Sequence, residues 1–357
     1  MNRIIRIYGI VQGVGFRPFV SRLAHELKVR GSVSNKGSYV EVLAKGDERI
    51  LDDLAKRIRH DAPERSTILK TDVKPYTGNE LDAFSESTPY DDDSFIIKES
   101  EKEAGDIFVS PDIATCDKCR KELYDPSDRR YMHPFINCTA CGPRVTILDS
   151  MPYDRVRTSM GEFPMCPECE KEYTSPETRR YDAQPVCCND CGPHVYIMGT
   201  DVRDREAITL SRKAIRDGKI IAVKGIGGFH LCCDANNEEA VALLRTRKNR
   251  PVKPFAVMMK DMETVRRYCE VTKEQEEILT GHQKPILLLK KRKDASLAPS
   301  VAPGNPCIGV MLPYAPVQML LFEYNDNFDV GTDCFVMTSG NVSGAPICRS
   351  DEDAEKE

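Results

Sequence analysis

Eight of the fifteen cysteines stand in four Cys-x2-Cys pairs, and this spacing constrains the fold more than any other feature of the chain. In each half of the array, eighteen residues separate the first pair from the second. A Cys-x2-Cys pair lets two thiolates reach one metal ion from a tight turn, and two pairs complete a closed tetrahedron. We therefore expect two structural Zn²⁺ ions, held by Cys116, Cys119, Cys138, Cys141, Cys166, Cys169, Cys188 and Cys191.

The two halves of the array are an internal duplication, offset by fifty residues. The match extends beyond the cysteines to Pro126/Pro176, Arg129/Arg179, Arg130/Arg180, Tyr131/Tyr181, Gly142/Gly192 and Pro143/Pro193. The spacing leaves open whether each repeat closes on itself or the pairs interleave. The chain is long, shows no export signal and pairs its cysteines as metal ligands, which need reduced thiols. Thiols stay reduced in the cytoplasm, so we expect a cytoplasmic protein. The other seven cysteines are expected to be buried small hydrophobic residues: Cys187, Cys232, Cys233, Cys269, Cys307, Cys334 and Cys348.

Length and charge narrow the possible functions. A chain of 357 residues predicts two or three domains. The formal net charge is -5, and residues 106–197 carry 11 Lys and Arg against 15 Asp and Glu. Eight thiolates with two Zn²⁺ ions add a further -4, so the module is a poor ligand for a phosphate backbone and we expect no nucleic-acid partner. No apolar run reaches membrane-spanning length, so we expect no membrane partner.

Three compositional zones suggest three domains, at 1–98, 106–198 and 200–357. The first alternates between the periods of strands and helices in the order βαββαβ, which predicts a ferredoxin-like α+β domain. A further strand is expected at 95–98, after an acidic linker over 78–94. The second zone lacks periodic apolar residues, so metal must hold it together.

The third zone alternates helical and extended patterns and predicts an α/β domain with a mixed sheet. Helices are expected at 208–216, 238–247 and 315–323. Strands are expected at 220–223, 255–259, 285–289, 309–312 and 335–338. The chain stops in what reads as a helix start, so we expect this domain to be C-terminally truncated.

The segment GIVQGVGFRP, residues 9–18, joins the first strand to the first helix. Gly13 and Gly15 allow a tight turn that exposes N–H groups toward an anion, and Arg17 can offer a bidentate fork to phosphate oxygens. Together with Asn35, this segment resembles the acylphosphatase family. The resemblance implies that Arg17 binds the phosphate and Asn35 positions the attacking water, which suits an acyl phosphate because its leaving group is good.

Two segments of the last zone combine cations with small polar residues. They are KNRPVK, residues 248–253, and TSGNVSG, residues 338–344. Taken singly, they read as a solvated basic patch and a loop; together they resemble the YrdC family. That resemblance implies that Lys248, Arg250 and Lys253 neutralise the charge of a triphosphate, and that Ser339 and Asn341 contact the nucleotide. His230, in KGIGGFHL, is as well explained as a packed core histidine as by a functional role.

The order of the three zones resembles the HypF carbamoyltransferases of NiFe-hydrogenase maturation, as do the phrases YMHPFINCTACGPR, AVKGIGGFHL and NRPVKPFAVM. The resemblance implies hydrolysis of carbamoyl phosphate to carbamate, its activation by ATP with Mg²⁺ as carbamoyl-adenylate, and transfer to the C-terminal cysteine of the partner HypE. The family's transferase domain is not in this chain, so a fragment is expected. In the second repeat, Asp182 stands where the family usually has histidine.

Two other functions remain as alternatives. A zinc-dependent scaffold or chaperone-like module would carry similar Cys-x2-Cys repeats, but it would need none of the polar residues singled out above. A threonylcarbamoyl-adenylate synthase acting in tRNA modification would share the last domain. Fusion to an acylphosphatase-like domain and the acidic finger module disfavour that second alternative.

Overall fold

The computed structural model describes residues 1–84, 90–91, 94–100, 110–342 and 344–356. The chain forms two compact units. The first comprises Met1–Asp112 and Asn137–Gly192, and the second comprises Ile113–Ile136 and Pro193–Glu357. The expected acidic linker 78–94 and the boundary at 106 fall partly or wholly outside the described residues.

The first unit contains a five-stranded sheet in the order β4-β1-β3-β2-β5. Its strands are β1 (Asn2–Ile10), β2 (Arg30–Lys36), β3 (Tyr39–Lys45), β4 (Thr67–Pro75) and β5 (Phe95–Ile97). The first four pair antiparallel, and β5 adds to β2 in parallel. The predicted ferredoxin-like βαββαβ arrangement is confirmed, with β5 as the extra strand at the edge of the sheet.

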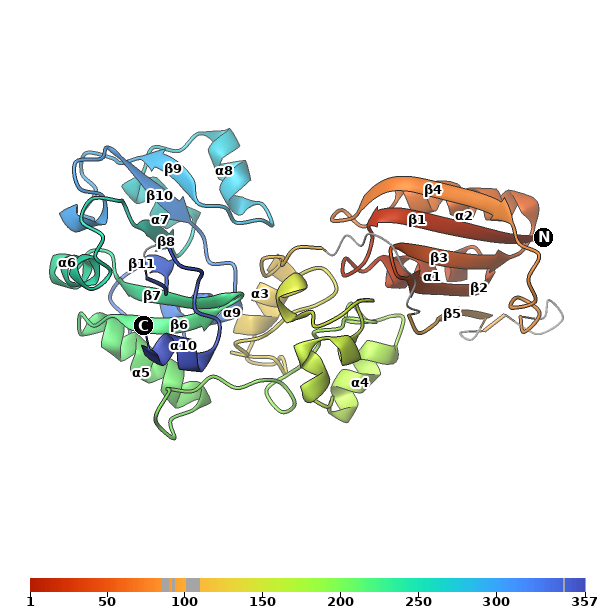
Figure 1. The fold of residues 1–357 in the computed structure, drawn as a ribbon, viewed down its shortest axis with the longest axis horizontal. Helices are drawn as coiled ribbons and strands as arrows, with labels where there is room; N and C mark the ends of the chain where they lie inside the picture. Colours follow the sequence, from red (N-terminus) through yellow and green to blue (C-terminus); the bar gives the residue numbers. More distant parts are fainter. Residues whose placement is uncertain (85–89, 92–93, 101–109, 343, 357) are drawn as a thin grey trace. The chain divides into compact units, whose positions relative to one another are not determined.

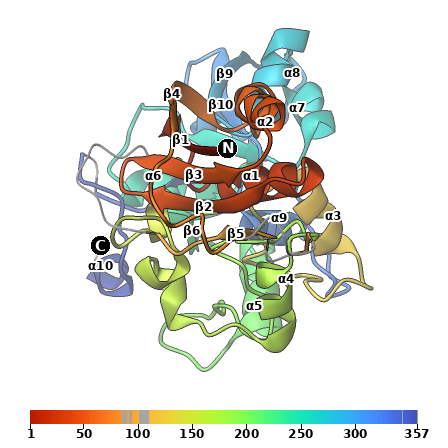
Figure 2. The same ribbon diagram turned by 90° about the vertical axis from the view of Figure 1, so that its right-hand side faces the viewer.

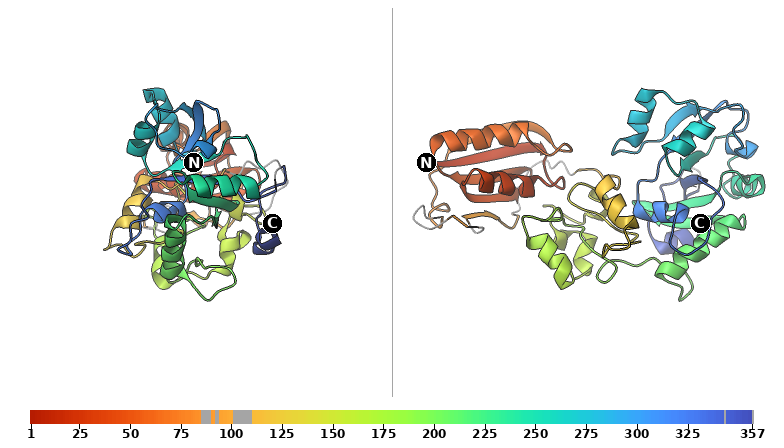
Figure 3. Two further views of the ribbon diagram at one scale, coloured as in Figure 1. Left: turned by 90° about the vertical axis from the view of Figure 1, so that its left-hand side faces the viewer. Right: turned by 180° about the vertical axis from the view of Figure 1, so that it is seen from behind.

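Helices α1 (Phe16–Glu26) and α2 (Glu48–His60) cover one face of this sheet (Figures 2 and 3). Their apolar residues recur every three or four positions, which places them on one side of each helix. The α2 helix begins at Asp47, whose carboxylate accepts a hydrogen bond from Arg49 N at 2.9 Å. The resulting core consists of Ile5, Ile7, Val20, Leu23, Val33, Val40, Val42, Leu51, Leu54, Ile58 and their neighbours.

The second unit contains a six-stranded mixed sheet in the order β6-β7-β11-β8-β10-β9 (Figure 1). Its strands are β6 (Ile221–Gly225), β7 (Gly228–Asp234), β8 (Ala256–Met259), β9 (Leu287–Lys290), β10 (Cys307–Met311) and β11 (Cys334–Ser339). Among the strand pairs that the structure describes in this unit, β8–β10 is parallel and the others are antiparallel. β7 was not predicted, because the glycines of KGIGGFHL read as a loop whereas they form the turn of the β6–β7 hairpin.

Both faces of the second sheet are covered by helices. These are α5 (Asp204–Arg216), α6 (Glu238–Arg247), α7 (Met262–Tyr268), α8 (Lys273–Thr280) and α9 (Pro316–Phe322). The last helix, α10 (Asp351–Lys356), buries none of its residues. Neighbouring strand residues alternate between two core clusters, so that Val257 packs with α6, α7 and α8 while Met258 packs with α5 and α9. In the second cluster, Phe322 stacks on Phe335 with ring centroids 4.0 Å apart.

The duplication in the sequence is also a duplication in structure. Helix α3 (Asp117–Tyr124) recurs fifty residues later as α4 (Pro167–Thr174). Met132 N donates to Leu123 O at 2.8 Å, and Asp182 N donates to Tyr173 O at the same distance. Both Met132 and Asp182 have a left-handed backbone, with φ values of 55° and 56°. Short 3-10 helices complete the chain: η2 (Val145–Ile147), η3 (Arg155–Arg157), η4 (Ser159–Glu162) and η5 (Pro299–Val301).

The cysteines outside the Cys-x2-Cys pairs are packed as expected. Six are buried and Cys307 is half-buried. Burial raises the pKa of Cys233, Cys269 and Cys334 to about 12, so these thiols are protonated at neutral pH. Among the described residues, no helix is both long and apolar enough to cross a membrane.

Candidate active site and metal centres

The loop between β1 and α1 is shaped by two glycines. Gly13 and Gly15 have φ values of 71° and 75°, a region that costs a glycine little. A Cβ on Gly13 would lie 3.1 Å from Arg144 Cδ, and one on Gly15 would lie 3.3 Å from Thr139 Cβ. No described side chain caps the start of α1, so its first N–H groups face the loop and can receive an anion.

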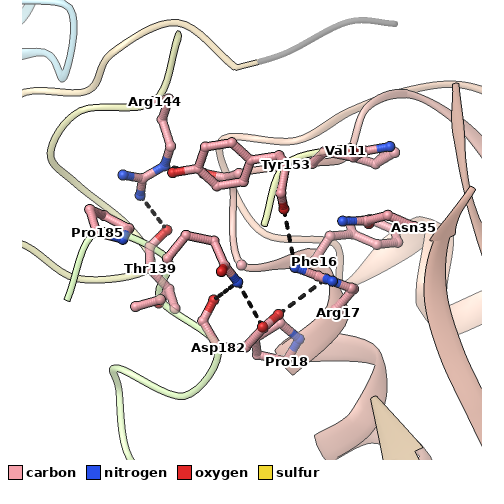
Figure 4. A pocket seen from close by; sticks show the side chains of 15 residues that line it. Val11, Phe16, Arg17, Pro18, Asn35, Thr139, Arg144, Tyr153, Asp182 and Pro185 are labelled. Atoms are coloured by element: carbon pink, nitrogen blue, oxygen red, sulfur yellow. Dashed lines mark hydrogen bonds and ion pairs between the residues drawn. The ribbon is translucent and has the colours of Figure 1, made fainter. Parts of the chain in front are cut away.

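Arg17, in the first turn of α1, is buried among acceptors from distant parts of the first unit (Figure 4). Its Nη1 lies 3.0 Å from Asp154 Oδ1 and 3.1 Å from Ser100 Oγ. Its Nε lies 3.1 Å from Asp182 Oδ2, whereas Nη2 makes only a 3.4 Å contact with the carbonyl of Tyr153. The guanidinium therefore holds two carboxylates through Nε and Nη1 and is least occupied at Nη2.

Two carboxylates meet the guanidinium of Arg17, and Asp154 is also paired with Arg157, whose Nη1 lies 2.8 Å from Asp154 Oδ2. Burial disfavours the charged form of Arg17, but Asp182 and Asp154 outweigh it and raise the pKa of Arg17. Burial also raises the pKa of Asp182, and the charge of Arg17 offsets this only in part. Arg17 is thus permanently charged, while Asp182 holds a proton more readily than an ordinary aspartate.

Asn35, near the end of β2, faces the same pocket as Arg17. Gln12 Nε2 donates to Gly37 O at 3.0 Å and so ties the β1–α1 loop to the β2–β3 turn. Asn35 Oδ1, Gln12 Oε1 and the Tyr153 hydroxyl are buried without a hydrogen-bond partner among the described residues. The space that the centres of water molecules can occupy in this pocket is about 20 Å³, so the pocket is narrow in this structure. Buried polar atoms without partners indicate a place for a polar ligand or water.

The pocket also contains residues that the sequence interpretation missed. Arg144 and Asp182 line the pocket, whereas Asp154 contacts Arg17 without lining it. All three come from residues 137–192, more than a hundred positions beyond Arg17. Arg144 is buried and donates through Nε to the carbonyl of Gly13, which fixes the glycine loop. Two signals pointed to Asp182, because it stands where the family usually has histidine and occupies the position that Met132 holds in the first repeat.

The eight paired cysteines form two clusters, one for each repeat. Cys116, Cys119, Cys138 and Cys141 bring their Sγ atoms within 4.8 Å of one another, and so do Cys166, Cys169, Cys188 and Cys191. Sulfur–sulfur distances include 3.7 Å for Cys138–Cys141 and 3.8 Å for Cys166–Cys188. Zn–S bonds of about 2.3 Å in a tetrahedron imply an edge of roughly 3.8 Å. Both clusters therefore fit a zinc ion, and each repeat closes on itself.

In the second unit, the residues of the two polar motifs meet at the end of β11. Lys248 Nζ donates to Ser339 O at 2.6 Å and to Asn341 O at 2.9 Å. Ser339 Oγ donates to Asn341 Oδ1 at 2.6 Å, and Arg250 Nη1 lies 3.4 Å from the hydroxyl of Thr338. Lys253 has an exposed side chain and approaches this group only through its carbonyl, which accepts from Arg250 Nε. Ser343 lies outside the described residues.

His230, on β7, is packed beside Tyr314, with 3.5 Å between Nε2 and the phenol oxygen. Its Nδ1 and the Nε2 of Gln318 are buried without partners among the described residues. Burial lowers the pKa of His230, so the ring is neutral at physiological pH.

Fold and sites together define a multi-domain protein with an acylphosphatase-type domain, paired four-cysteine fingers and a YrdC-type domain. Residues 3–85 match the acylphosphatase family, residues 115–148 and 165–198 match the HypF finger, and residues 213–357 match the Sua5/YciO/YrdC family, described as telomere recombination. The chain belongs to the HypF carbamoyltransferase family.

Individual relatives agree with this assignment. Carbamoyltransferase HypF2 of Cupriavidus necator is 44% identical over 98% of this chain and 44% of its own length. A crystal structure of full-length HypF in a phosphate- and nucleotide-bound form is 45% identical, with a TM-score of 0.89 over 99% of this chain and 45% of that one. An acylphosphatase of Yersinia pseudotuberculosis is 37% identical over 22% of this chain and 87% of its own length. The chain thus spans less than half the length of the HypF relatives.

Proposed function

We propose that the first unit hydrolyses carbamoyl phosphate to carbamate and inorganic phosphate. The observation that carries this proposal is the convergence of Arg17, the uncapped start of α1 and Asn35 on one pocket. Arg17 and the loop N–H groups bind the phosphate, and Asn35 orients the attacking water. One water is consumed, the bond between phosphorus and the acyl oxygen breaks, and carbamate leaves with the electron pair.

The second unit then activates carbamate with ATP and Mg²⁺ as carbamoyl-adenylate and releases pyrophosphate. Lys248, Arg250 and Lys253 neutralise the triphosphate, while Ser339 and Asn341 contact the nucleotide. The contacts of Lys248 with Ser339 and Asn341 support this assignment, because they bring both motifs to one strand end. The acceptor of the carbamoyl group is the C-terminal cysteine of HypE, on the strength of family membership alone.

We further propose that the three functional segments are the domains 1–98, 106–198 and 200–357. The two zinc ions are structural, since four thiolates leave no open coordination position for a substrate. Their role is to fix residues 137–192, which contribute Arg144 and Asp182 to the pocket of the first unit and Asp154 to the contacts of Arg17.

Phosphate release from carbamoyl phosphate tests the first step. We expect hydrolysis by the purified chain, loss of at least about 100-fold in kcat/KM for Arg17→Lys and for Asn35→Ala, and unchanged activity for the control Arg57→Lys on α2. Arg17→Lys keeps a cation between the carboxylates, so the loss measures the guanidinium fork rather than folding. A folded, zinc-loaded chain that releases no phosphate would contradict the proposal.

A further inference from the structure

The pocket around Arg17 holds more acceptors than the binding of an anion requires. Phosphate oxygens need donors, and the loop N–H groups and Arg17 supply them. The pocket nevertheless also presents the carboxylate of Asp182, and the Gln12 Oε1 and Asn35 Oδ1 atoms of two further lining residues are buried without partners among the described residues. Asn35 is accounted for by the attacking water, which leaves Asp182 and Gln12 for another part of the ligand.

Asp182 is held rigidly and still has acceptor capacity. Its Oδ2 accepts from Arg17 Nε, and its Oδ1 accepts from Gln184 Nε2 at 2.8 Å, with the Tyr173 hydroxyl at 3.4 Å. A carboxylate can accept about four hydrogen bonds, so at least one remains for the pocket side. Gln184 is fixed in turn, because its Oε1 accepts from Arg155 N at 2.6 Å.

The contacts of Arg17 indicate how the phosphate end and the acyl end of a substrate are oriented in the pocket. Asp182 occupies Nε, and Asp154 and Ser100 occupy Nη1, so Nη2 and the start of α1 are left for the phosphate. A dianion directly against Asp182 would be repelled by its charge. The acyl group, which carries no charge, is therefore the end that meets Asp182.

We propose that Asp182 determines which acyl group the site accepts, by receiving a hydrogen bond from an N–H on the acyl carbon. This inference rests on the proposed hydrolysis of acyl phosphates. A carbamoyl group supplies such a donor and its second N–H can reach a further acceptor such as Gln12. The methyl group of acetyl phosphate supplies no hydrogen-bond donor, so one acceptor position of the buried Asp182 carboxylate stays unpaired. A missing partner of this kind lowers the specificity constant by about 10- to 100-fold.

The test compares kcat/KM for carbamoyl phosphate and acetyl phosphate in the zinc-loaded chain. We expect the wild type to prefer carbamoyl phosphate about 10- to 100-fold, and Asp182→Ala to bring the ratio close to one while acetyl phosphate is still hydrolysed. The control Asp149→Asn removes an exposed carboxylate from the same part of the unit and should keep the wild-type ratio. A purely structural role for Asp182 would lower both specificity constants equally, and that result would overturn the inference.

Two further readouts keep the test decisive. If Asp182→Ala does not fold, Asp182→Asn preserves the shape of the side chain but offers fewer acceptor positions, and its ratio must still fall. If the wild type hydrolyses neither compound, the proposed function fails, and the selection is read from calorimetric dissociation constants of the two intact acyl phosphates. Equal affinities in that measurement, or an unchanged ratio in both Asp182 variants, would refute the role of Asp182.

Discussion

Replacing Arg17 should destabilise the first unit as well as abolish its activity, because the guanidinium neutralises two carboxylates that are themselves mostly buried. The exposed fractions of the side chains are 7% for Arg17, 18% for Asp154 and 11% for Asp182. Removing one partner of a buried ion pair costs about 3–5 kcal/mol, because the remaining charge stays desolvated. Arg17→Gln should therefore lower the melting temperature of this unit by roughly 10 °C.

The loss should depend on pH in a defined direction. The pKa of Asp182 is raised in the folded state, so the stability that this group contributes is present at low pH and is lost as the pH rises through the folded value. Without Arg17 this effect grows, so Arg17→Gln should be more destabilised near pH 8 than near pH 5. Adding Asp182→Asn to Arg17→Gln should recover most of the lost stability, since Asp154 keeps its ion pair with Arg157 and Asp182 no longer carries an unpaired charge.

Calorimetry would measure the loss of stability, and hydrogen exchange of peptides from β1 and α1 would show that the loss occurs in the first unit. The control is Arg57→Gln, because Arg57 also joins two carboxylates, those of Glu26 and Asp61, but does so at the surface. Exposed ion pairs contribute little, so the control should behave like the wild type. A variant Arg17→Gln that is as stable as the wild type at every pH would refute the interpretation of the cluster as a buried charge network.

Three further predictions concern other parts of the molecule. Metal analysis should find two zinc ions per chain. The double variant Cys188→Ser/Cys191→Ser should retain one ion and lose hydrolysis, because the segment that carries Asp182 is no longer fixed. Two retained ions would contradict clusters closed within each repeat. Burial lowers the pKa of His230, so the second unit should lose stability as the pH falls below 6.5, the ordinary value, and His230→Gln should reduce this loss in acid titrations followed by circular dichroism. Lys248→Met should weaken ATP binding at least about 10-fold in a fluorescent-nucleotide titration. The substitution removes a cation and the hydrogen bonds that Lys248 donates to the carbonyls of Ser339 and Asn341. Unchanged affinity would place the nucleotide elsewhere.

Local sequence patterns were sufficient for most of the fold. The apolar periods of α1 and α2 and the alternation in β1 and β3 predict the first sheet and its helices almost residue by residue, since each element buries one face. β7 was missed for a local reason. Its flanking glycines adopt φ values of 89° and 150° at Gly227 and Gly228, and a glycine-rich turn looks the same in a hairpin as in a ligand-binding loop.

The zinc clusters show what spacing can and cannot determine. Eight cysteines in a duplicated array predict two tetrahedral sites, because a thiolate has few other reasons to recur at such intervals. They do not determine which pairs meet, since the eighteen-residue segments could connect either way. The four Sγ atoms of each repeat lie within 4.8 Å of one another, and the 3.8 Å between Cys166 and Cys188 joins the two pairs of the second repeat, which assigns one cluster to each repeat.

The composition of the Arg17 pocket could not be predicted from sequence, because half of its wall comes from a segment that has no apolar pattern of its own. Asp154 and Asp182 are 137 and 165 positions from Arg17, and the fold of residues 137–192 brings them to it. A zinc finger serves this purpose better than a small apolar core would. Four thiolates fix the turns around Asp182 without occupying the volume that a core needs, so polar side chains can line the pocket. The cost is that the site depends on metal although no metal takes part in the chemistry, and loss of zinc should therefore alter substrate selection before it unfolds the sheet beneath.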